Sequence, residues 1–287
     1  MKVSIVVPSF NHAHFIRETL DSILSQNYPE IEVLVFDGGS RDGTVEILES
    51  YGDEIRYVSR KDHGQSDAIN QGLRAASGDI LAYLNSDDIY YPGAIARVVR
   101  HFTENPETLC LYGNALHLHA DGLPMERYYC EPWSYDRLLD VCFICQPAAF
   151  WRREVIERFG VFDESLNWAM DYEYWLRIGR HVSFDFLEDA YLAGSRLHED
   201  TKTLSQRVKV HEEILEIVMR YSPRLPERWL MNLATVITRD VKMPAYHGIP
   251  SEKLRRAWMI EAVFDRATHH GIPVGKELLQ KFEQLLS

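Results

Sequence analysis

The sequence has few cysteines and no long apolar run, and each shortage excludes a class of protein. Its 287 residues include 4 cysteines, too few for the disulfide framework of a small secreted domain. Cys142 and Cys145 have C-x-x-C spacing, but no second pair completes a zinc site, so core packing is favoured over metal or redox chemistry. No stretch approaches the roughly 18–20 apolar residues of a membrane span, and we see no signal peptide. These absences predict a cytoplasmic protein.

Positive charge is also scarce, which limits the partners that the chain can bind. Lys and Arg number 31 against 43 Asp and Glu, giving a formal net charge of −12. A nucleic-acid-binding protein needs a basic surface, so no nucleic-acid partner is expected. Broad attachment to an anionic membrane is disfavoured for the same reason, although a local basic patch would still permit peripheral membrane contact. The length allows one large domain or two modest ones.

The first 105 residues alternate strand-like and helix-like segments. Apolar runs predict strands at 3–7, 31–36, 55–58 and 80–84, with another at 109–112, and the intervening segments predict helices at 13–25, 44–50, 65–76 and 92–103. We expect Gly78 to end the third of these helices. The alternation predicts an α/β fold, a mostly parallel twisted sheet with helices on both faces. Ligands of such sheets bind beyond the carboxyl ends of the strands, where polar segments 9–11, 37–44 and 85–88 fall.

The pattern changes after residue 105 and again after residue 200. The middle part predicts a hairpin over 115–129 turning at Asp121 and Gly122, strands at 147–151 and 182–187, and helices at 153–159 and 167–179. The last part predicts helices at 203–221, 227–241, 252–270 and 275–286, separated by prolines. We therefore expect an α/β domain over 1–200, divided into 1–105 and 106–200, and a helical C-terminal appendage over 201–287.

A short acidic cluster follows the apolar run at 80–84, in the sequence Asn85-Ser86-Asp87-Asp88. Two adjacent carboxylates after a buried strand repel each other, and desolvation adds to the penalty. A hard divalent cation such as Mg²⁺ or Mn²⁺ would compensate. Alternatively, Asp87 or Asp88 caps the helix that follows. The position of the cluster at the expected ligand edge favours the metal.

The carboxylates of Asp171 and Glu173 compete for the role of a general base. Residues two apart on a helix do not share a face, and Asp171 falls on an otherwise apolar stripe with Trp168 and Trp175. Glu173 precedes Arg177 by four residues, which suits a surface ion pair. An inward carboxylate is the better base because partial burial raises its pKa toward the working pH. The alternative for Asp171 is an acidic residue stabilised by the helix dipole.

Five segments in a fixed order resemble the family 2 glycosyltransferases, whose nucleotide-diphospho-sugar transferase fold is known as GT-A. These segments are VSIVVPSFN at 3–11, VFDGGSRDGT at 35–44, DHGQSDAINQG at 62–72, GDILAYLNSDD at 78–88 and MDYEYWLR at 170–177. The resemblance covers roughly residues 1–200 and makes 1–105 the nucleotide-binding half and 106–200 the acceptor half. A dinucleotide-binding protein would instead have a Gly-rich turn after the first strand, where this chain has Pro-Ser-Phe-Asn.

The resemblance implies an inverting, metal-dependent transfer of a sugar from a nucleotide-diphospho-sugar, expected to be a UDP-sugar, to an acceptor hydroxyl. The acceptor would be a glycan or a lipid-linked molecule in bacterial surface polysaccharide or glycan synthesis, and the enzyme would work in the cytoplasm or at the inner face of the membrane. The alternative is an inactive nucleotide-sugar-binding or scaffold protein on the same fold. Asp171 would be the catalytic base.

The resemblance also assigns positions to the donor. These are Pro8, Ser9, Asn11, Asp37, Gly39, Gln65, Asp67, Asn70, Asn85, Ser86 and Asp87. Asp37 would contact the nucleotide base, or else it only forms the turn before Gly38. Asp67 stands where the family more often has Arg nearby to meet the diphosphate; it would touch sugar hydroxyls, or only cap its helix.

Three residues are candidates for Mn²⁺ or Mg²⁺. The resemblance gives Asp88 as the metal ligand and places Asp87 near the ribose or sugar, with contact to the metal as a further option. His198 would reach the diphosphate or the metal, or it is structural. Asn85 departs from the family, which often has a third Asp there, and the lower charge would weaken metal binding without nucleotide.

The C-terminal helices have three alternative roles. They would pack on the catalytic domain, form a homodimer contact, or lie on a membrane near a lipid-linked acceptor. Basic residues stand beside tryptophans at Arg228 and Trp229 and at Arg256 and Trp258, as at interfacial surfaces. Solvated helix faces would give the same pattern.

Overall fold

The computed structural model describes residues 1–199, 201, 206–222, 226–246, 248–272, 275–276, 279–280 and 283–284. The chain forms two compact units. We name them the sheet unit, residues 1–138 with 142–199, and the helical unit, residues 139–141 with 200–287. The helix expected over 275–286 lies largely outside the described residues, as does the start of the one expected from 203.

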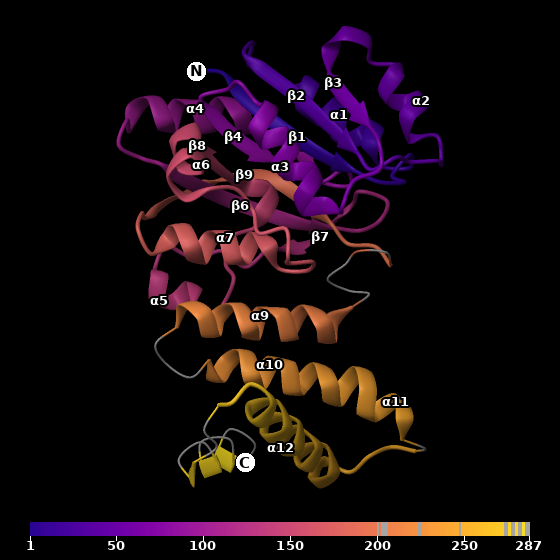
Figure 1. The fold of residues 1–287 in the computed structure, drawn as a ribbon, viewed down its shortest axis with the longest axis vertical. Helices are drawn as coiled ribbons and strands as arrows, with labels where there is room; N and C mark the ends of the chain where they lie inside the picture. The colour runs from indigo at the N-terminus through magenta and orange to yellow at the C-terminus, as the bar shows by residue number, and fades with distance from the viewer. Residues whose placement is uncertain are drawn as a thin grey trace. The chain divides into compact units, whose positions relative to one another are not determined.

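The sheet unit contains a mixed sheet in the order β3-β2-β1-β4-β8-β6-β9-β5, with β7 paired to β6 (Figure 1). The strands are β1 Val3–Ser9, β2 Ile31–Asp37, β3 Arg56–Ser59, β4 Ile80–Tyr83, β5 Ile89–Tyr90, β6 Cys110–Leu118, β7 Pro124–Arg127, β8 Ala149–Arg152 and β9 Phe184–Arg196. The expected parallel arrangement holds for β1 to β4. Beyond β4 the sheet is mixed, because β8 runs antiparallel to both β4 and β6.

Helices cover both faces of the sheet, as the α/β pattern predicts (Figure 1). They are α1 Ile16–Leu24, α2 Thr44–Glu49, η1 Gly52–Glu54, α3 Gln65–Ala75, α4 Ala94–Glu104, α5 Tyr135–Leu138, η2 Gln146–Ala148, α6 Arg153–Phe159 and α7 Met170–Gly179. One apolar core joins α1, α2 and α4 to alternate residues of the central strands, such as Ile5, Val35 and Ala82. On the other face α3 lies against β1 so closely that a Cβ on Gly72 would stand 2.3 Å from Val6 Cγ1.

Two glycines have roles that the sequence pattern did not predict. Gly78 does not end α3, because Ala76 closes the last turn by donating to the carbonyl of Gly72. A Cβ on Gly78 would instead lie 2.7 Å from the nitrogen of Ser4, so this glycine permits close approach to β1. The N-cap of α4 is Gly93, with φ of +79°. The alternative of an Asp87 or Asp88 cap is therefore wrong.

The helical unit consists of α9 Arg207–Tyr221, α10 Glu227–Ile237, the π-helix η3 Thr238–Lys242, α11 Met243–Ala245 and α12 Glu252–His269. Trp229 is buried, and its indole N–H donates to the carbonyl of Leu139 over 3.1 Å. This tryptophan is therefore a core residue of the unit rather than part of an exposed interfacial face. In the described part of the chain, none of the helices combines the length and apolar character needed to span a bilayer.

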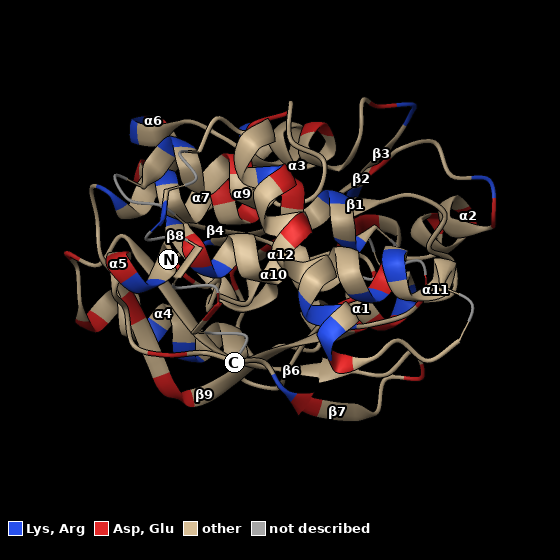
Figure 2. Cartoon of the chain, turned by 90° about the horizontal axis from the view of Figure 1, so that it is seen from below, with Lys and Arg blue, Asp and Glu red and all other residues tan. Residues whose placement is uncertain are grey.

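Charges of both signs are interspersed along the described elements of the sheet unit (Figure 2). The acidic residues outnumber the basic ones overall, and many pair with a neighbour, as Glu154 does with Arg158 and Glu131 with Arg137.

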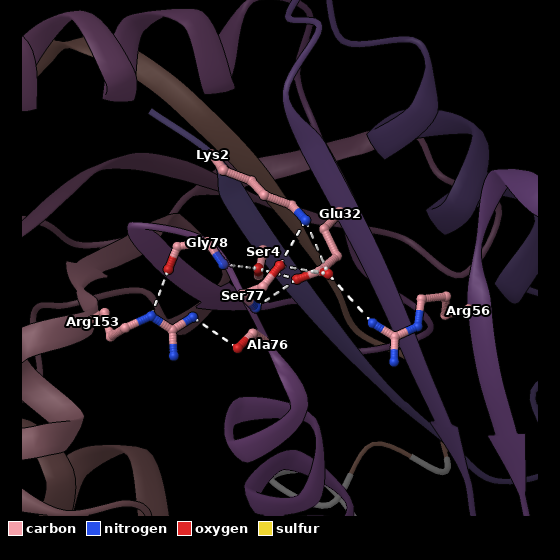
Figure 3. A network of polar contacts seen from close by, with 8 residues as sticks. All are labelled: Lys2, Ser4, Glu32, Arg56, Ala76, Ser77, Gly78 and Arg153. Atoms are coloured by element: carbon pink, nitrogen blue, oxygen red, sulfur yellow. Dashed lines mark hydrogen bonds and ion pairs between the residues drawn. The ribbon is translucent and has the colours of Figure 1, made fainter.

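A polar network ties the amino ends of the parallel strands together (Figure 3). The Glu32 carboxylate on β2 accepts hydrogen bonds from Ser4 Oγ on β1 (2.5 Å), from the Ser77 backbone N–H (2.8 Å) and from Lys2 Nζ (3.1 Å). Burial raises the pKa of Glu32, but these donors together outweigh it and hold the pKa at about 2. Arg153 fastens the same corner by donating to the carbonyls of Gly78 and Ala76.

We predict that Glu32→Gln lowers the free energy of unfolding at pH 7 by roughly 2–3 kcal/mol. Because the folded pKa of Glu32 lies below the unfolded one, its stabilisation is complete above about pH 4.5 and is lost as the pH falls toward 2. Urea unfolding between pH 7 and pH 3 should therefore show the difference from the native chain shrinking with acid. Glu30→Gln, an exposed neighbour, is the control. A difference that stays constant with pH would contradict the role of the Glu32 charge.

Candidate functional site

Three polar segments meet at the carboxyl ends of β1, β2 and β4. Register places Ser9 on β1 beside Asp37 on β2. The Asn11 side chain accepts from the backbone N–H of Arg41 (3.0 Å), which joins the segments after β1 and β2. His12 Nδ1 lies 2.7 Å from Ser86 Oγ and joins the segments after β1 and β4. The edge that the sequence predicted for ligands is therefore a set of loops bonded to one another.

The carboxylate of Asp37 is buried and builds the turn after β2. One oxygen, Oδ2, accepts from the backbone N–H groups of Gly39 (3.0 Å) and Ser40 (2.9 Å) and from Ser59 Oγ (2.6 Å). The other accepts from Ser40 Oγ. These contacts correspond to the turn-forming alternative. The Asp37 carboxylate is therefore occupied by contacts within the turn and is not accessible at the surface of this loop.

A shallow recess adjoins this turn, lined by Phe36, Asp37, Val58, Arg60, Asp62, Ala68 and Gln71. Beside it the Phe10 ring is 60% exposed. A Cβ on Gly38 would lie 3.2 Å from the Phe10 ring and 3.0 Å from Asp62 Oδ2. An exposed ring offers a stacking surface and a carboxylate accepts hydrogen bonds, so the corner has the chemistry to bind a planar heterocycle.

Asp88 is enclosed by its own loop and is only 3% exposed. Its Oδ1 accepts from the backbone N–H of Arg196 (2.8 Å), and its Oδ2 accepts from Asn85 Nδ2 (3.2 Å). Burial, and next the charge of Asp87, raise the pKa of Asp88 well above its usual value. Asn85, where a third acidic residue would add to this repulsion, instead donates to Asp88 and accepts from Gln65 Nε2 (2.7 Å).

Asp87 faces the other way and pairs with His198. Its Oδ2 lies 2.9 Å from His198 Nε2, and its side chain is 13% exposed. The Phe15 ring stacks on His198 with centroids 4.8 Å apart, and the His12 ring lies 6.2 Å from the same imidazole. Among the described residues there is no group of three or more His, Cys, Asp or Glu that could hold a metal by itself. One carboxylate and one imidazole fit a divalent cation whose other ligands are phosphate oxygens and water.

Two residues expected near the donor mainly hold protein segments together. Asp67 accepts from the backbone N–H of His63 (3.1 Å), as in the capping alternative. Asn70 is fully buried, and its side chain both donates to and accepts from the backbone of Phe162. Asn70 therefore fastens α3 to the segment before α7.

Asp171 lies in the first turn of α7 and is half-buried. Glu173 is only 3% exposed, and its carboxylate pairs with Arg177 at 3.0 Å. The predicted ion pair exists, but its predicted surface position is wrong. Arg177 also donates to the carbonyls of Phe159 and Val161. Most residues of α7 are buried, so helical periodicity alone could not separate the two carboxylates. They differ in burial, because Asp171 is half-buried and Glu173 is almost fully buried.

Asp171 and the acidic loop lie around the same buried residues. Burial, followed by the charges of Asp171 and Asp88, raises the pKa of Tyr83 well above its usual value. Burial is also the main cause of the raised pKa of Cys145, and the same two carboxylates contribute. Asp171 is therefore within electrostatic reach of the residues that flank Asp88.

The four cysteines are free thiols, in agreement with packing rather than disulfide formation.

Sequence reasoning did not single out Phe10, His12 or Asp62 as site residues, although all three line this edge. A signal was present for Phe10 and His12, which stand on either side of Asn11 in the segment directly after β1. An aromatic ring and an imidazole at the carboxyl end of a buried strand are unusual choices for a simple turn. Asp62 opens the resembling segment at 62–72, but its position beside Gly38 depends on how the third strand pairs with the second.

Known proteins resemble this chain in sequence and in fold. A sequence model of the family described as "Glycosyl transferase family 2" matches residues 4–160. An uncharacterized glycosyltransferase from Rickettsia prowazekii (strain Madrid E) is 30% identical over 227 residues, which is 74% of this chain and 70% of that protein. The chain spans only about a third of the length of several longer Rickettsia relatives.

Two solved structures share the fold. Staphylococcus aureus TarS 1–349 in complex with UDP-GlcNAc has a TM-score of 0.62 at 18% identity, covering 92% of this chain and 82% of that one. The mannosyltransferase PcManGT from Pyrobaculum calidifontis, in complex with GDP-Man and Mn²⁺, has a TM-score of 0.56 at 17% identity, covering 99% and 79%. The predicted GT-A architecture is thus confirmed. The family model that matches residues 4–160 and the relative from Rickettsia prowazekii together show that the chain belongs to glycosyl transferase family 2.

Proposed function

We propose that this glycosyltransferase moves a sugar from UDP to an acceptor hydroxyl with inversion at the anomeric carbon. The observation that carries the proposal is the Asp87–His198 pair, which lies at the edge where the loops after β1, β2 and β4 meet. Family membership supports the reaction class. A glycan or lipid-linked acceptor, as in surface polysaccharide synthesis, is part of the proposal.

The nucleotide would bind at the corner formed by Phe10, Gly38 and Asp62. The exposed Phe10 ring would stack on the base, and the Asp62 carboxylate would accept a hydrogen bond from a base N–H. Uracil presents one such N–H, which fits a single carboxylate. Asp37 would act by shaping the turn through its backbone contacts. The complex of TarS with UDP-GlcNAc supports a uridine nucleotide in this fold.

Asp87 and His198 would hold Mn²⁺ or Mg²⁺ together with the diphosphate. Their 2.9 Å pairing puts a carboxylate and an imidazole side by side, whereas both carboxylate oxygens of Asp88 accept hydrogen bonds from protein groups. We therefore propose direct ligation by Asp87 and His198; Asp88, which the resemblance gave as the metal ligand, has a supporting role in this proposal. The Mn²⁺ in the PcManGT complex supports a metal in this fold. When bound, the cation neutralises charge on the departing diphosphate.

Asp171 would act as the base. Its carboxylate would take the proton of the acceptor hydroxyl while that oxygen bonds to the anomeric carbon and the bond from that carbon to the diphosphate oxygen breaks. Attack from the side opposite the leaving group inverts the configuration. Glu173 is a poorer candidate, because Arg177 holds its carboxylate in a buried ion pair. Proton transfer needs a carboxylate that can reach the substrate.

Binding of nucleotide diphosphates tests the donor and the metal together. In calorimetric titrations we expect UDP to bind in the presence of Mn²⁺ and to bind less tightly when EDTA removes the metal. Asp87→Asn should weaken the metal-dependent binding at least tenfold, about 1.4 kcal/mol, whereas Asp53→Asn, an exposed residue outside the site, should not. Absence of any metal-dependent nucleotide binding would contradict the proposal. Binding without turnover of any sugar donor would favour the scaffold alternative.

Thermal and urea unfolding separate the roles of the two adjacent carboxylates. Asp88→Ala should lower the free energy of unfolding by about 1–3 kcal/mol, because the backbone N–H of Arg196 would lose its partner in a buried site. Asp87→Ala should change it less, since its side chain is more accessible and accepts from one imidazole. The measurements are made without nucleotide or metal. Equal losses in the two variants would contradict the division of roles.

Replacement of the proposed base should lower the rate of sugar transfer and leave the affinity for the donor unchanged. We expect Asp171→Asn to reduce turnover by about 10²–10⁴-fold, the usual contribution of a positioned base, with donor affinity unchanged. Glu173→Gln serves as the comparison: it should lower thermal stability, because it weakens a buried ion pair, while the folded fraction keeps its turnover. Near-normal transfer by Asp171→Asn would overturn the assignment.

A further inference from the structure

Arg196, the last residue of β9, carries a buried cation close to the acidic loop. It is 2% exposed, and a guanidinium is costly to bury unless each side is paired. Its Nε donates to the carbonyl of Asp87 (2.8 Å), one terminal nitrogen donates to the carbonyl of Ala120 (3.0 Å), and the other donates to Glu18 Oε2 (2.7 Å). The side chain therefore bonds in three directions to three different segments.

These contacts bring together parts of the sheet unit that are distant in sequence. Glu18 belongs to α1, Asp87 to the turn between β4 and β5, and Ala120 to the tip of the β6–β7 hairpin. The hairpin tip packs tightly, because a Cβ on Gly122 would stand 3.2 Å from both a terminal nitrogen of Arg196 and Glu18 Oε1. The tip therefore lies against the Arg196–Glu18 pair, and the buried guanidinium has little freedom to move.

Arg196 fixes both partners of the Asp87–His198 pair. It holds the main chain of Asp87 through the carbonyl, and its own backbone N–H holds the Asp88 carboxylate one residue further on. Its guanidinium also lies over the Phe15 ring, 5.3 Å from the centroid, and the same ring stacks on His198. The orientation of the carboxylate and the position of the imidazole are therefore both linked to this one side chain.

We propose that Arg196 is a positioning residue of the donor site, which sets the Asp87 carboxylate and the His198 imidazole at the separation that a cation and diphosphate require. The inference rests on the proposed function of that pair. The planar guanidinium is essential to this role because it directs its donors along fixed, divergent lines. A lysine would keep the charge, but its single nitrogen cannot meet the three acceptors where they stand.

The experiment compares Arg196→Lys with Arg153→Lys, a matched control. Arg153 also donates to two backbone carbonyls, those of Gly78 and Ala76, but at the amino ends of the strands (Figure 3). Mn²⁺ is titrated calorimetrically into each protein in the presence of UDP. We expect Arg196→Lys to weaken Mn²⁺ binding by roughly 10–100-fold, the usual effect of losing a residue that supports metal ligands. Arg153→Lys should leave it unchanged. Equal behaviour of the two variants would overturn the proposal.

Turnover supplies a second readout that a purely structural role would not move. The Mn²⁺ concentration for half-maximal turnover should rise in Arg196→Lys, whereas kcat at saturating Mn²⁺ should fall much less. Glu18→Gln, at an exposed residue, keeps the arginine but removes its ion pair, and should shift the Mn²⁺ dependence by a smaller factor. Glu18→Gln provides the test if Arg196→Lys does not fold. An unchanged Mn²⁺ dependence in Glu18→Gln would then count against the role of Arg196.

Hydrogen exchange without ligand distinguishes failure of this inference from failure of the proposed function. Amides of residues 85–88 should exchange faster in Arg196→Lys than in the native chain or in Arg153→Lys, because the loop loses its contact at the Asp87 carbonyl. Unaltered exchange would show that Arg196 does not hold the loop. If the native chain binds no nucleotide, the proposed function fails, and the exchange comparison still decides the positioning role.

Discussion

The repulsion between Asp87 and Asp88 is the constraint around which the edge of the sheet is organised. Two neighbouring carboxylates at the end of a buried strand cannot share one environment without a large electrostatic cost. The chain separates them: Asp88 turns inward to a backbone N–H and an amide, and Asp87 turns toward an imidazole. Asn85 relieves the repulsion further, because it supplies a donor where an acidic side chain would add another charge. In the proposed function, Asp87 is then the carboxylate that binds the ligand.

Most polar groups at this edge serve the protein before they serve a substrate. Asp37 closes a turn, Asn11 and His12 join loops, and Asn70 fastens a helix to a distant segment. Each of these contacts removes a degree of freedom from the loops around the Asp87–His198 pair. A site that must hold a flexible diphosphate and an acceptor oxygen in line depends on such preorganisation.

The sequence predicted elements well wherever the signal was local. The apolar runs of β1, β2 and β4 were located closely, because burial on both sheet faces leaves continuous apolar segments. The helix at 153–159 was also located closely. The antiparallel insertion of β8 between β4 and β6 was not predicted, since strand order is set by long-range pairing. The candidate site shows the same difference between local signals and long-range contacts. Its loops could be predicted from strand ends, but the partners of Glu173 and Asn70 come from segments that fold together only in the tertiary structure.

The network around Glu32 lies at the amino ends of the same strands whose carboxyl ends bear the loops of the site. The anchoring network and the loops of the site therefore lie at opposite ends of the same strands. This separation has a consequence for variation: residues of the loops can change, and so accept other donors or acceptors, without altering the contacts of the anchoring corner. It also suggests where to begin redesign. Substitutions that alter specificity belong at one end of β1, β2 and β4, and those that raise tolerance to such changes belong at the other.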